Sequence, residues 1–192
     1  MLYEIIFLGR GGQGAVTAAN ILVQASIYEG LYGQGFPFFG AERRGAPVTA
    51  YARLSNKPVL RHGMFSETDI LVVLDESLMK LGVAKKYRLR NKGVLIVNTS
   101  SKDIRRDQLT SVGPVEVYVV DATKIARELG LVVAGWPLVN TPILGALSAA
   151  TKIVSLKSVE KAILDYFGAK LGEKNAEAAR QAHNKLEFLG EV

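Results

Sequence analysis

The first twenty residues combine an apolar run with a glycine-rich turn, and this combination restricts the fold more than any other feature of the chain. Residues Leu2 to Leu8 are almost wholly apolar, and the segment LGRGGQGAVTAAN, residues 8–20, continues directly from them. A short continuous apolar run is typical of a strand that is covered on both faces. The small residues after the glycines favour a helix from Ala15 to Tyr28 that packs closely on a sheet. The start of the chain therefore predicts a strand, a tight turn and a helix.

Further apolar runs extend this pattern along the chain. Ile70 to Leu74, Gly93 to Asn98 and Val115 to Val120 are continuous enough to be buried strands. Val48 to Leu54 alternates small or apolar residues with polar ones, which indicates an exposed or edge strand. Helical patterns lie between these runs. We therefore expect residues 1–192 to form a single domain with a three-layer α/β/α, Rossmann-like fold around a mostly parallel, mixed sheet of about five or more strands.

Polar residues at the starts of the helical segments supply caps, because their side chains accept hydrogen bonds from the first N–H groups of a helix. Asp75 precedes a segment from Glu76 to Tyr87, and Asp121 precedes one from Thr123 to Leu129. The remaining predicted helices are Ile143 to Ala150, capped from the NTP motif that starts at Asn140, a helix that opens at Ser155 and closes at Gly168, and a final helix from Glu173 to Leu189.

One long segment interrupts this alternation. Gly30 to Pro47, GLYGQGFPFFGAERRGAP, is rich in glycine and aromatic residues, and a loop of this length is more often functional than not. Its adjacent Arg43 and Arg44 suit a phosphate or a carboxylate, and an ion pair with an acidic neighbouring chain explains them equally well. The phenylalanines favour a hydrophobic anchor in an interface with a partner chain. They are Phe36, Phe38 and Phe39.

The composition excludes several classes of site. The chain has no cysteine, so it supplies no thiolate for a disulfide, an iron–sulfur cluster or a nucleophile. Its only histidines, His62 and His183, lie far apart in the sequence, which argues against a histidine-rich metal site. The formal net charge is +6, and the sequence has no aromatic–basic repeats. This favours an anionic small ligand or an acidic partner over nucleic acid. We find neither a membrane-spanning apolar stretch nor a secretory signal, and we expect a cytoplasmic protein.

The glycine turn leaves more than one interpretation open. Gly9, Gly11 and Gly14 match the G-x-G-x-x-G spacing of dinucleotide-binding turns, and a helix N-terminus favours an anion. A dinucleotide site also needs a second buried strand that ends in an acidic residue, whereas here the helix runs into the Gly30 to Pro47 segment. The lysine and the Ser/Thr of a P-loop are missing as well. Dinucleotide binding is therefore the least favoured interpretation, and the others are that the turn binds another phosphate-bearing ligand or a partner chain, or serves only the fold.

Six blocks of sequence, in order, resemble the gamma subunit of the pyruvate:ferredoxin oxidoreductases, or pyruvate synthases, within the 2-oxoacid:acceptor oxidoreductase family. The resemblance extends from Leu8 to about Leu164 and is most specific where GRGGQG is combined with FPFFGAERRGAPV. The blocks are GRGGQGAVTAANIL, GQGFPFFGAERRGAPVTAYARLS, DILVVLDESL, VLIVNTS, DATKIARELG and NTPILGAL.

The resemblance implies one subunit of an enzyme that converts pyruvate, CoA and oxidised ferredoxin reversibly into acetyl-CoA, carbon dioxide and reduced ferredoxin. It implies that thiamine diphosphate, Mg and the iron–sulfur clusters belong to the alpha, beta and delta subunits. Those subunits are then the expected partners, and ferredoxin is the electron acceptor of the complex. The alternatives are a gamma subunit for 2-oxoisovalerate, 2-oxoglutarate or indolepyruvate, and a non-catalytic assembly subunit.

The residues suggest binding rather than catalysis. No Ser/His/Asp set, paired carboxylates or activated lysine is recognisable, so we expect neither an independent active site nor a metal site in this chain. With the resemblance, the glycine turn and the two arginines become candidate contacts for the phosphates of CoA. These candidates are Gly9, Gly11, Gly12, Gly14, Arg43 and Arg44.

Overall fold

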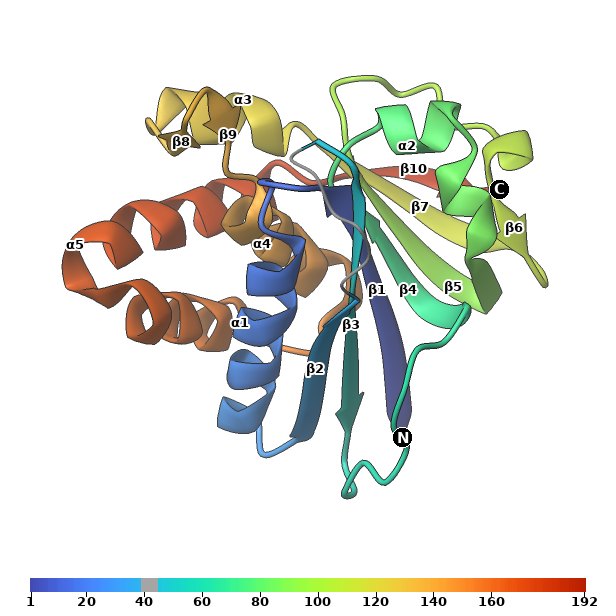
Figure 1. Ribbon diagram of the computed structural model, residues 1–192, viewed down its shortest axis with the longest axis horizontal. Coiled ribbons are helices and arrows are strands. Elements are labelled where there is room, and N and C mark those ends of the chain that lie inside the picture. Colours follow the sequence, from blue (N-terminus) through green and yellow to red (C-terminus); the bar gives the residue numbers. More distant parts are fainter. Residues whose placement is uncertain (39–44) are drawn as a thin grey trace.

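The computed structural model describes residues 1–38 and 45–192, which form a mixed sheet with helices packed around it (Figure 1). The elements in chain order are β1 (Leu2–Arg10), α1 (Ala15–Tyr28), β2 (Tyr32–Phe38), β3 (Pro47–Ser55), β4 (Glu67–Val73), α2 (Ser77–Lys80), the 3₁₀ turn η1 (Val83–Lys86), β5 (Arg88–Asn98), the 3₁₀ turn η2 (Arg106–Gln108), β6 (Thr110–Ser111), β7 (Val115–Val120), α3 (Ala122–Glu128), β8 (Val132–Val133), β9 (Trp136–Pro137), α4 (Asn140–Thr151), α5 (Leu156–Asn184) and β10 (Glu187–Glu191).

Within these described residues, an 8-stranded mixed sheet has the order β10-β7-β5-β4-β1-β3-β2, with β6 beside β5. Strands β1, β4, β5 and β7 are parallel neighbours, whereas β3, β2 and β10 are antiparallel to theirs. The continuous apolar runs form the parallel strands because both of their faces are covered. The predicted α/β architecture is confirmed.

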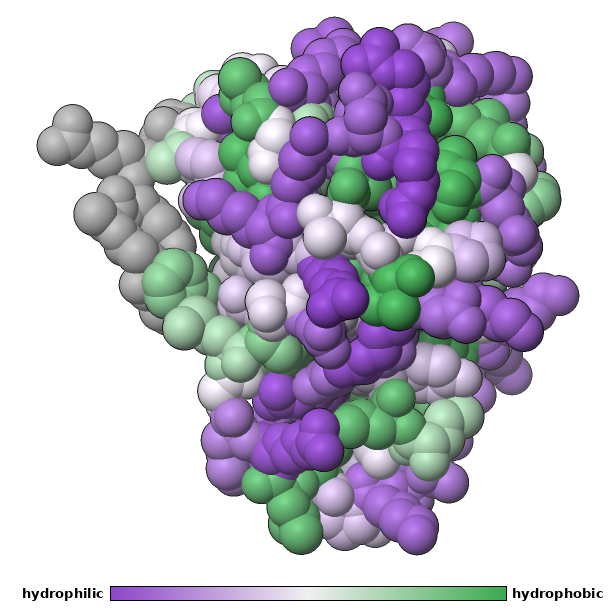
Figure 2. Space-filling view, turned by 90° about the vertical axis from the view of Figure 1, so that its right-hand side faces the viewer, coloured by the Kyte–Doolittle hydropathy of each residue, from purple (hydrophilic) through white to green (hydrophobic). Residues whose placement is uncertain are grey.

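Helices cover the two faces of the sheet unequally. Helices α1, α4 and α5 pack on one face, over a core that includes Phe7 and Leu144 (Figure 1). The other face carries α2, which packs through Leu78 and Met79. On the side of the molecule seen in Figure 2, hydrophilic side chains dominate and apolar ones are scattered. Because α1 and α2 lie on opposite faces, the carboxyl ends of β1 and β4 border the switch point at which α/β sheets usually bind ligands.

Strand β3 corrects the expectation of an edge strand at Val48 to Leu54. It lies between β1 and β2, and it is buried along its whole length after Pro47. The polar residues that suggested exposure have partners instead. Arg53 forms an ion pair with Glu4 at 2.8 Å, and the hydroxyls of Thr49 and Tyr87 lie 2.6 Å apart. A buried polar side chain costs little when it is paired in this way.

Strand β2 corrects the expectation that the whole Gly30 to Pro47 segment is a loop. Residues Tyr32–Phe38 pair with β3 and form an edge of the sheet. The glycines that suggested a loop are needed because α1 lies directly over this strand. A Cβ at Gly33 would lie 2.8 Å from atoms of both Ser26 and Val23.

Two predicted helices are shorter than expected. A glycine interrupts the first, and the end of the second pairs as a strand with the sheet. The segment Glu76 to Tyr87 is divided into α2 and η1, because Gly82 between them has φ 71° and ends the α-helix. The final helix ends at Asn184, and residues Glu187–Glu191 return to the sheet as β10, antiparallel to β7. The break predicted at Gly168 is confirmed as a kink inside α5.

The predicted helix caps have mixed outcomes. Asp121 accepts a hydrogen bond from the N–H of Lys124 at 2.8 Å, and Ser155 accepts one from Ser158 at 3.2 Å, as expected. Helix α4 instead begins at Asn140 itself, so Asn140 is not its N-cap. Separately, none of the helices within residues 1–38 and 45–192 has the length and apolarity needed to cross a membrane.

Helices α4 and α5 approach closely at Gly145, and this contact can be tested. A Cβ at Gly145 would overlap the main-chain carbonyl group of Ala179 in α5. We expect Gly145→Ala to lower the free energy of unfolding by about 1–3 kcal/mol through overpacking, measured by urea denaturation. An uncrowded helical glycine replaced by alanine would gain about 1 kcal/mol. A stabilised variant would therefore contradict the close contact.

Candidate functional site

The glycine turn joins β1 to α1 with backbone torsions that suit glycine. Gly12 has φ 99° and Gly14 has φ 84°, a region that other residues adopt only with strain. Gly14 is the N-cap of α1, and no side chain caps the first turn of that helix. The first N–H groups of a helix have no partner within it, and they carry the positive end of its dipole. The turn is therefore a place where an anion is favoured.

A cavity of about 390 Å³ lies in front of this turn, and its lining includes Gly11, Gly12, Gly14, Leu138 and Phe167. This arrangement offers main-chain donors beside apolar surface. A ligand that carries both an anionic group and an apolar part fits such a cavity.

Asn140 adds a side chain that sequence reasoning assigned only to helix capping. It lines the same cavity and is only 3% exposed. Its Oδ1 accepts the N–H of Thr141 at 3.0 Å, whereas its Nδ2 donates to no group among the described residues. That Nδ2 lies against Gly14, since a Cβ on Gly14 would be 2.7 Å from it. The amide is thus a further donor beside the N-terminus of α1.

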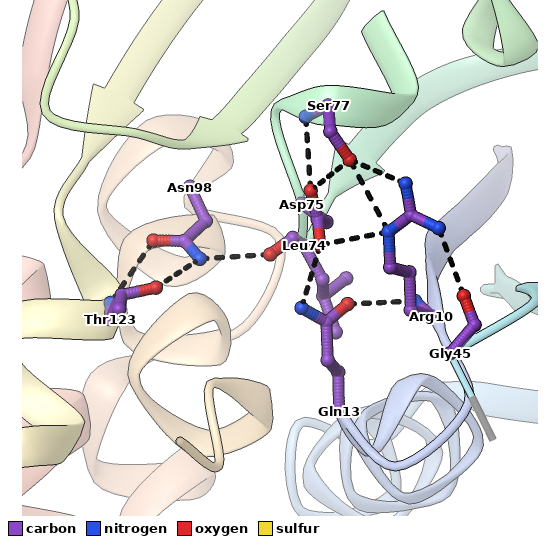
Figure 3. A network of polar contacts seen from close by, with 8 residues as sticks. All are labelled: Arg10, Gln13, Gly45, Leu74, Asp75, Ser77, Asn98 and Thr123. Atoms are coloured by element: carbon purple, nitrogen blue, oxygen red, sulfur yellow. Dashed lines mark hydrogen bonds and ion pairs between the residues drawn. The ribbon is translucent and has the colours of Figure 1, made fainter. Parts of the chain in front are cut away.

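Arg10 and Asp75 connect the ends of β1 and β4 (Figure 3). The Arg10 Nε lies 3.2 Å from Asp75 Oδ2, and its Nη2 donates to Ser77 Oγ at 2.7 Å. Gln13 completes the connection. Its Oε1 accepts the N–H of Arg10 at 2.7 Å, and its Nε2 donates to Asp75 at 3.2 Å. Asp75 also accepts the N–H of Ser77 at 3.0 Å, but α2 begins at Ser77 with Glu76 as its N-cap, so the expectation that Asp75 is the N-cap is wrong.

The chain at Gly45 and Ala46 is held against the glycine turn. The N–H of Gly11 donates to the carbonyl of Ala46 at 2.9 Å, and the N–H of Gly45 donates to the carbonyl of Gly11 at 3.2 Å. Arg10 Nη1 donates to the carbonyl of Gly45 at 2.9 Å (Figure 3). The predicted contacts Arg43 and Arg44 lie outside the described residues. The structure does place the residue that follows Arg44 beside Gly11.

Other candidates occupy different surroundings. Gly9 packs within β1, where a Cβ would lie 3.3 Å from both Gln13 Oε1 and Leu74 Cβ. Phe36 stacks on Tyr51 with ring centroids 5.1 Å apart, so its ring contacts the domain's own side chains. Phe38 is 44% exposed, and Phe39 lies outside the described residues.

A second cavity, of about 440 Å³, lies at the carboxyl ends of β5 and β7. Its lining includes the carboxylates of Glu76, Asp121 and Glu128 and the cationic side chains of Lys124 and Arg127. Hydrogen bonds from Lys80 and then Thr99 lower the pKa of Glu76, so that this group is charged at neutral pH. Because three carboxylates outnumber two cationic side chains in its lining, this cavity is less suitable for an anion than the one at the glycine turn.

Residues 4–185 match the family described as pyruvate ferredoxin/flavodoxin oxidoreductase. The chain belongs to this family. Within it, the chain is 50% identical over 189 residues to the "Pyruvate/ketoisovalerate oxidoreductases common subunit gamma" of Pyrococcus furiosus, which covers 98% of this chain and 99% of the relative. It is 46% identical to the "Pyruvate synthase subunit PorC" of Methanocaldococcus jannaschii, covering 96% and 97% of the two chains.

A solved structure of a similar protein agrees with the fold. The pyruvate oxidoreductase subunit PORC of Thermotoga maritima aligns with a TM-score of 0.80 and 33% identity, covering 97% of this chain and 98% of that one. The family resemblance expected from the sequence blocks is confirmed.

The crowding at Gly14 gives a test of the turn. Gly12→Ala and Gly14→Ala both place an alanine at positive φ, which costs about 1–2 kcal/mol. Only Gly14→Ala also forces a Cβ against Asn140, so we expect it to lower the free energy of unfolding further, as measured by urea denaturation. Combining it with Asn140→Ala should remove most of the difference between the two variants. Equal costs at both glycines would contradict the contact.

Proposed function

We propose that the chain is the gamma subunit of a multi-subunit pyruvate synthase, in which residues 1–192 act as one domain in the cytoplasm. The complex would convert pyruvate, CoA and oxidised ferredoxin reversibly into acetyl-CoA, carbon dioxide and reduced ferredoxin. The named subunits that the chain matches over nearly their full length support this proposal. Since the gamma subunit of Pyrococcus furiosus is described as common to pyruvate and ketoisovalerate oxidoreductases, use with a branched 2-oxoacid is the second candidate.

The proposed contribution of this chain is to bind the phosphates of CoA. The hydrogen bonds of Gly11 with Gly45 and Ala46 are the observation that carries the proposal. They hold Gly45, the residue that follows Arg44, against a turn that favours anions. CoA needs donors for a pyrophosphate and a ribose 3′-phosphate, and it also has an apolar arm. The N-terminus of α1, the Asn140 amide and the apolar wall fit these needs. The proposal adds Arg43 and Arg44 as phosphate contacts because guanidinium groups bind phosphate well.

The redox and thiamine chemistry is assigned to the proposed alpha, beta and delta partners. Iron–sulfur clusters are held by cysteine thiolates, and this chain has no cysteine. Thiamine diphosphate with Mg supplies the carbanion chemistry when it is bound in the complex. This chain then orients CoA toward that centre and contributes no catalytic residue.

An assembly role without CoA contact is the remaining alternative. Phe38 favours it, since an exposed aromatic side chain at the end of the edge strand β2 suits a protein interface. Phe36 does not, because it already stacks on Tyr51. The two roles predict different responses to removal of the arginines.

We expect Arg43→Ala combined with Arg44→Ala to raise the KM for CoA about ten-fold or more. Loss of charge-assisted hydrogen bonds worth about 1.5–3 kcal/mol accounts for an effect of this size. The measurement is a steady-state CoA titration on the assembled complex, after its subunit stoichiometry has been verified. Carbon dioxide exchange without CoA serves as the internal control and should change much less. An unchanged KM for CoA would favour the assembly role.

A further inference from the structure

The side chain of Arg10 lies at the cavity wall, but it is already engaged within the chain. It lines the cavity in front of the glycine turn, and its side chain is only 22% exposed. Its Nε faces Asp75, its Nη2 donates to Ser77, and its Nη1 donates to the carbonyl of Gly45. The planar guanidinium thus joins three segments that are distant in sequence (Figure 3).

We propose that Arg10 is a positioning residue, which holds the glycine turn and the Gly45 backbone in place for the ligand and does not itself bind the CoA phosphates. The proposal rests on the CoA-binding function proposed above. It adds a role for Arg10 and Asp75, which are not among the candidate contacts.

The charges around Arg10 favour positioning over direct contact. The Asp75 side chain is 21% exposed and its Oδ2 lies 3.2 Å from the Arg10 Nε, so its negative charge offsets the positive charge of the guanidinium at the cavity wall. A nearby carboxylate also repels an incoming phosphate. An arginine that served mainly to attract phosphate would be weakened by this neighbour, whereas an arginine that holds a backbone carbonyl is oriented by it.

Gln13 connects the same carboxylate to the other side of the turn. It is only 6% exposed, and it joins the N–H of Arg10 to the Oδ2 of Asp75. The main chain on both sides of the turn therefore depends on Asp75, through Gln13 at Arg10 and through the guanidinium at Gly45. Loss of Asp75 should loosen the pairing of Gly11 with Gly45 and Ala46.

The test compares Arg10→Lys and Asp75→Asn in the assembled complex. Lysine retains the positive charge but loses the planar set of donors, and asparagine removes the carboxylate charge at nearly constant volume. We expect both variants to raise the KM for CoA five-fold or more, with a smaller effect on kcat and on carbon dioxide exchange. We also expect faster amide hydrogen exchange in the peptide that contains Gly11. Arg88→Gln is the matched control, because it removes an exposed ion pair with Glu67, and it should match the wild type in both measurements.

The sign of the Asp75→Asn effect decides between the two roles. If Arg10 contacts phosphate directly, removal of the competing carboxylate lowers or preserves the KM for CoA, and that result overturns the proposal. Unchanged amide exchange at Gly11 in either variant also overturns it. The Arg43/Arg44 double variant separates the two levels of inference. If the double variant raises the KM for CoA while Arg10→Lys and Asp75→Asn leave it unchanged, only the positioning role is rejected. If the KM for CoA is unchanged in all of these variants, CoA binding at this surface is rejected.

Discussion

Strand β1 sets the register of the sheet, because it joins the antiparallel part to the parallel part. It pairs with β3 along Leu2–Arg10 and with β4 on its other side. Its Glu4 is buried, and it accepts hydrogen bonds from Arg53 at 2.8 Å and from Arg90 at 2.5 Å. Burial alone would raise the pKa of Glu4, but the hydrogen bonds from Arg90 and Arg53 outweigh it and lower the pKa. A shift of β1 by one residue along the sheet would turn Glu4 to the other face and leave its buried charge without either arginine, which is strongly unfavourable.

The opposite end of the same strand carries the candidate site. The register that pairs Glu4 with Arg53 also pairs Arg10 with Pro47. Gly45 and Ala46 therefore reach the glycine turn, and Leu74 donates its N–H to the carbonyl of Leu8 at 2.8 Å, which brings Asp75 alongside. The site is thus positioned by strand pairing, and this fixes its donors more firmly than a free loop would.

A subunit with this structure suits a binding role in a larger enzyme. The phosphates of CoA lie far from its thiol, so contacts to them supply binding and orientation rather than chemistry. A turn that presents main-chain N–H groups does this without any titratable group. The chain has no cysteine and so supplies no thiolate to a redox centre, which is compatible with the proposed binding role.

The sequence by itself determined the parts of this protein that depend on local pattern. The apolar runs of β1, β4, β5 and β7, the helix after the glycines and the caps at Asp121 and Ser155 are local signals, and the structure confirms them. The family was likewise recognisable from short blocks of sequence. The positive φ of Gly12 and Gly14 is also local, because a tight turn into a helix requires it.

Only the tertiary structure decided which polar residues are buried and which segments complete the sheet. Strands β2 and β10 contain glycine or charged residues that suggest a loop or a helix, and pairing with β3 and β7 overrides those preferences. Arg10 and Asp75 are 65 residues apart, and Asn140 is farther still from Gly14. No periodicity can reveal such contacts, because they form only when folding brings distant elements together. Arg10 meets Asp75 where two parallel strands end at one edge of the sheet, and Asn140 meets Gly14 where the first residue of α4 lies beside the start of α1.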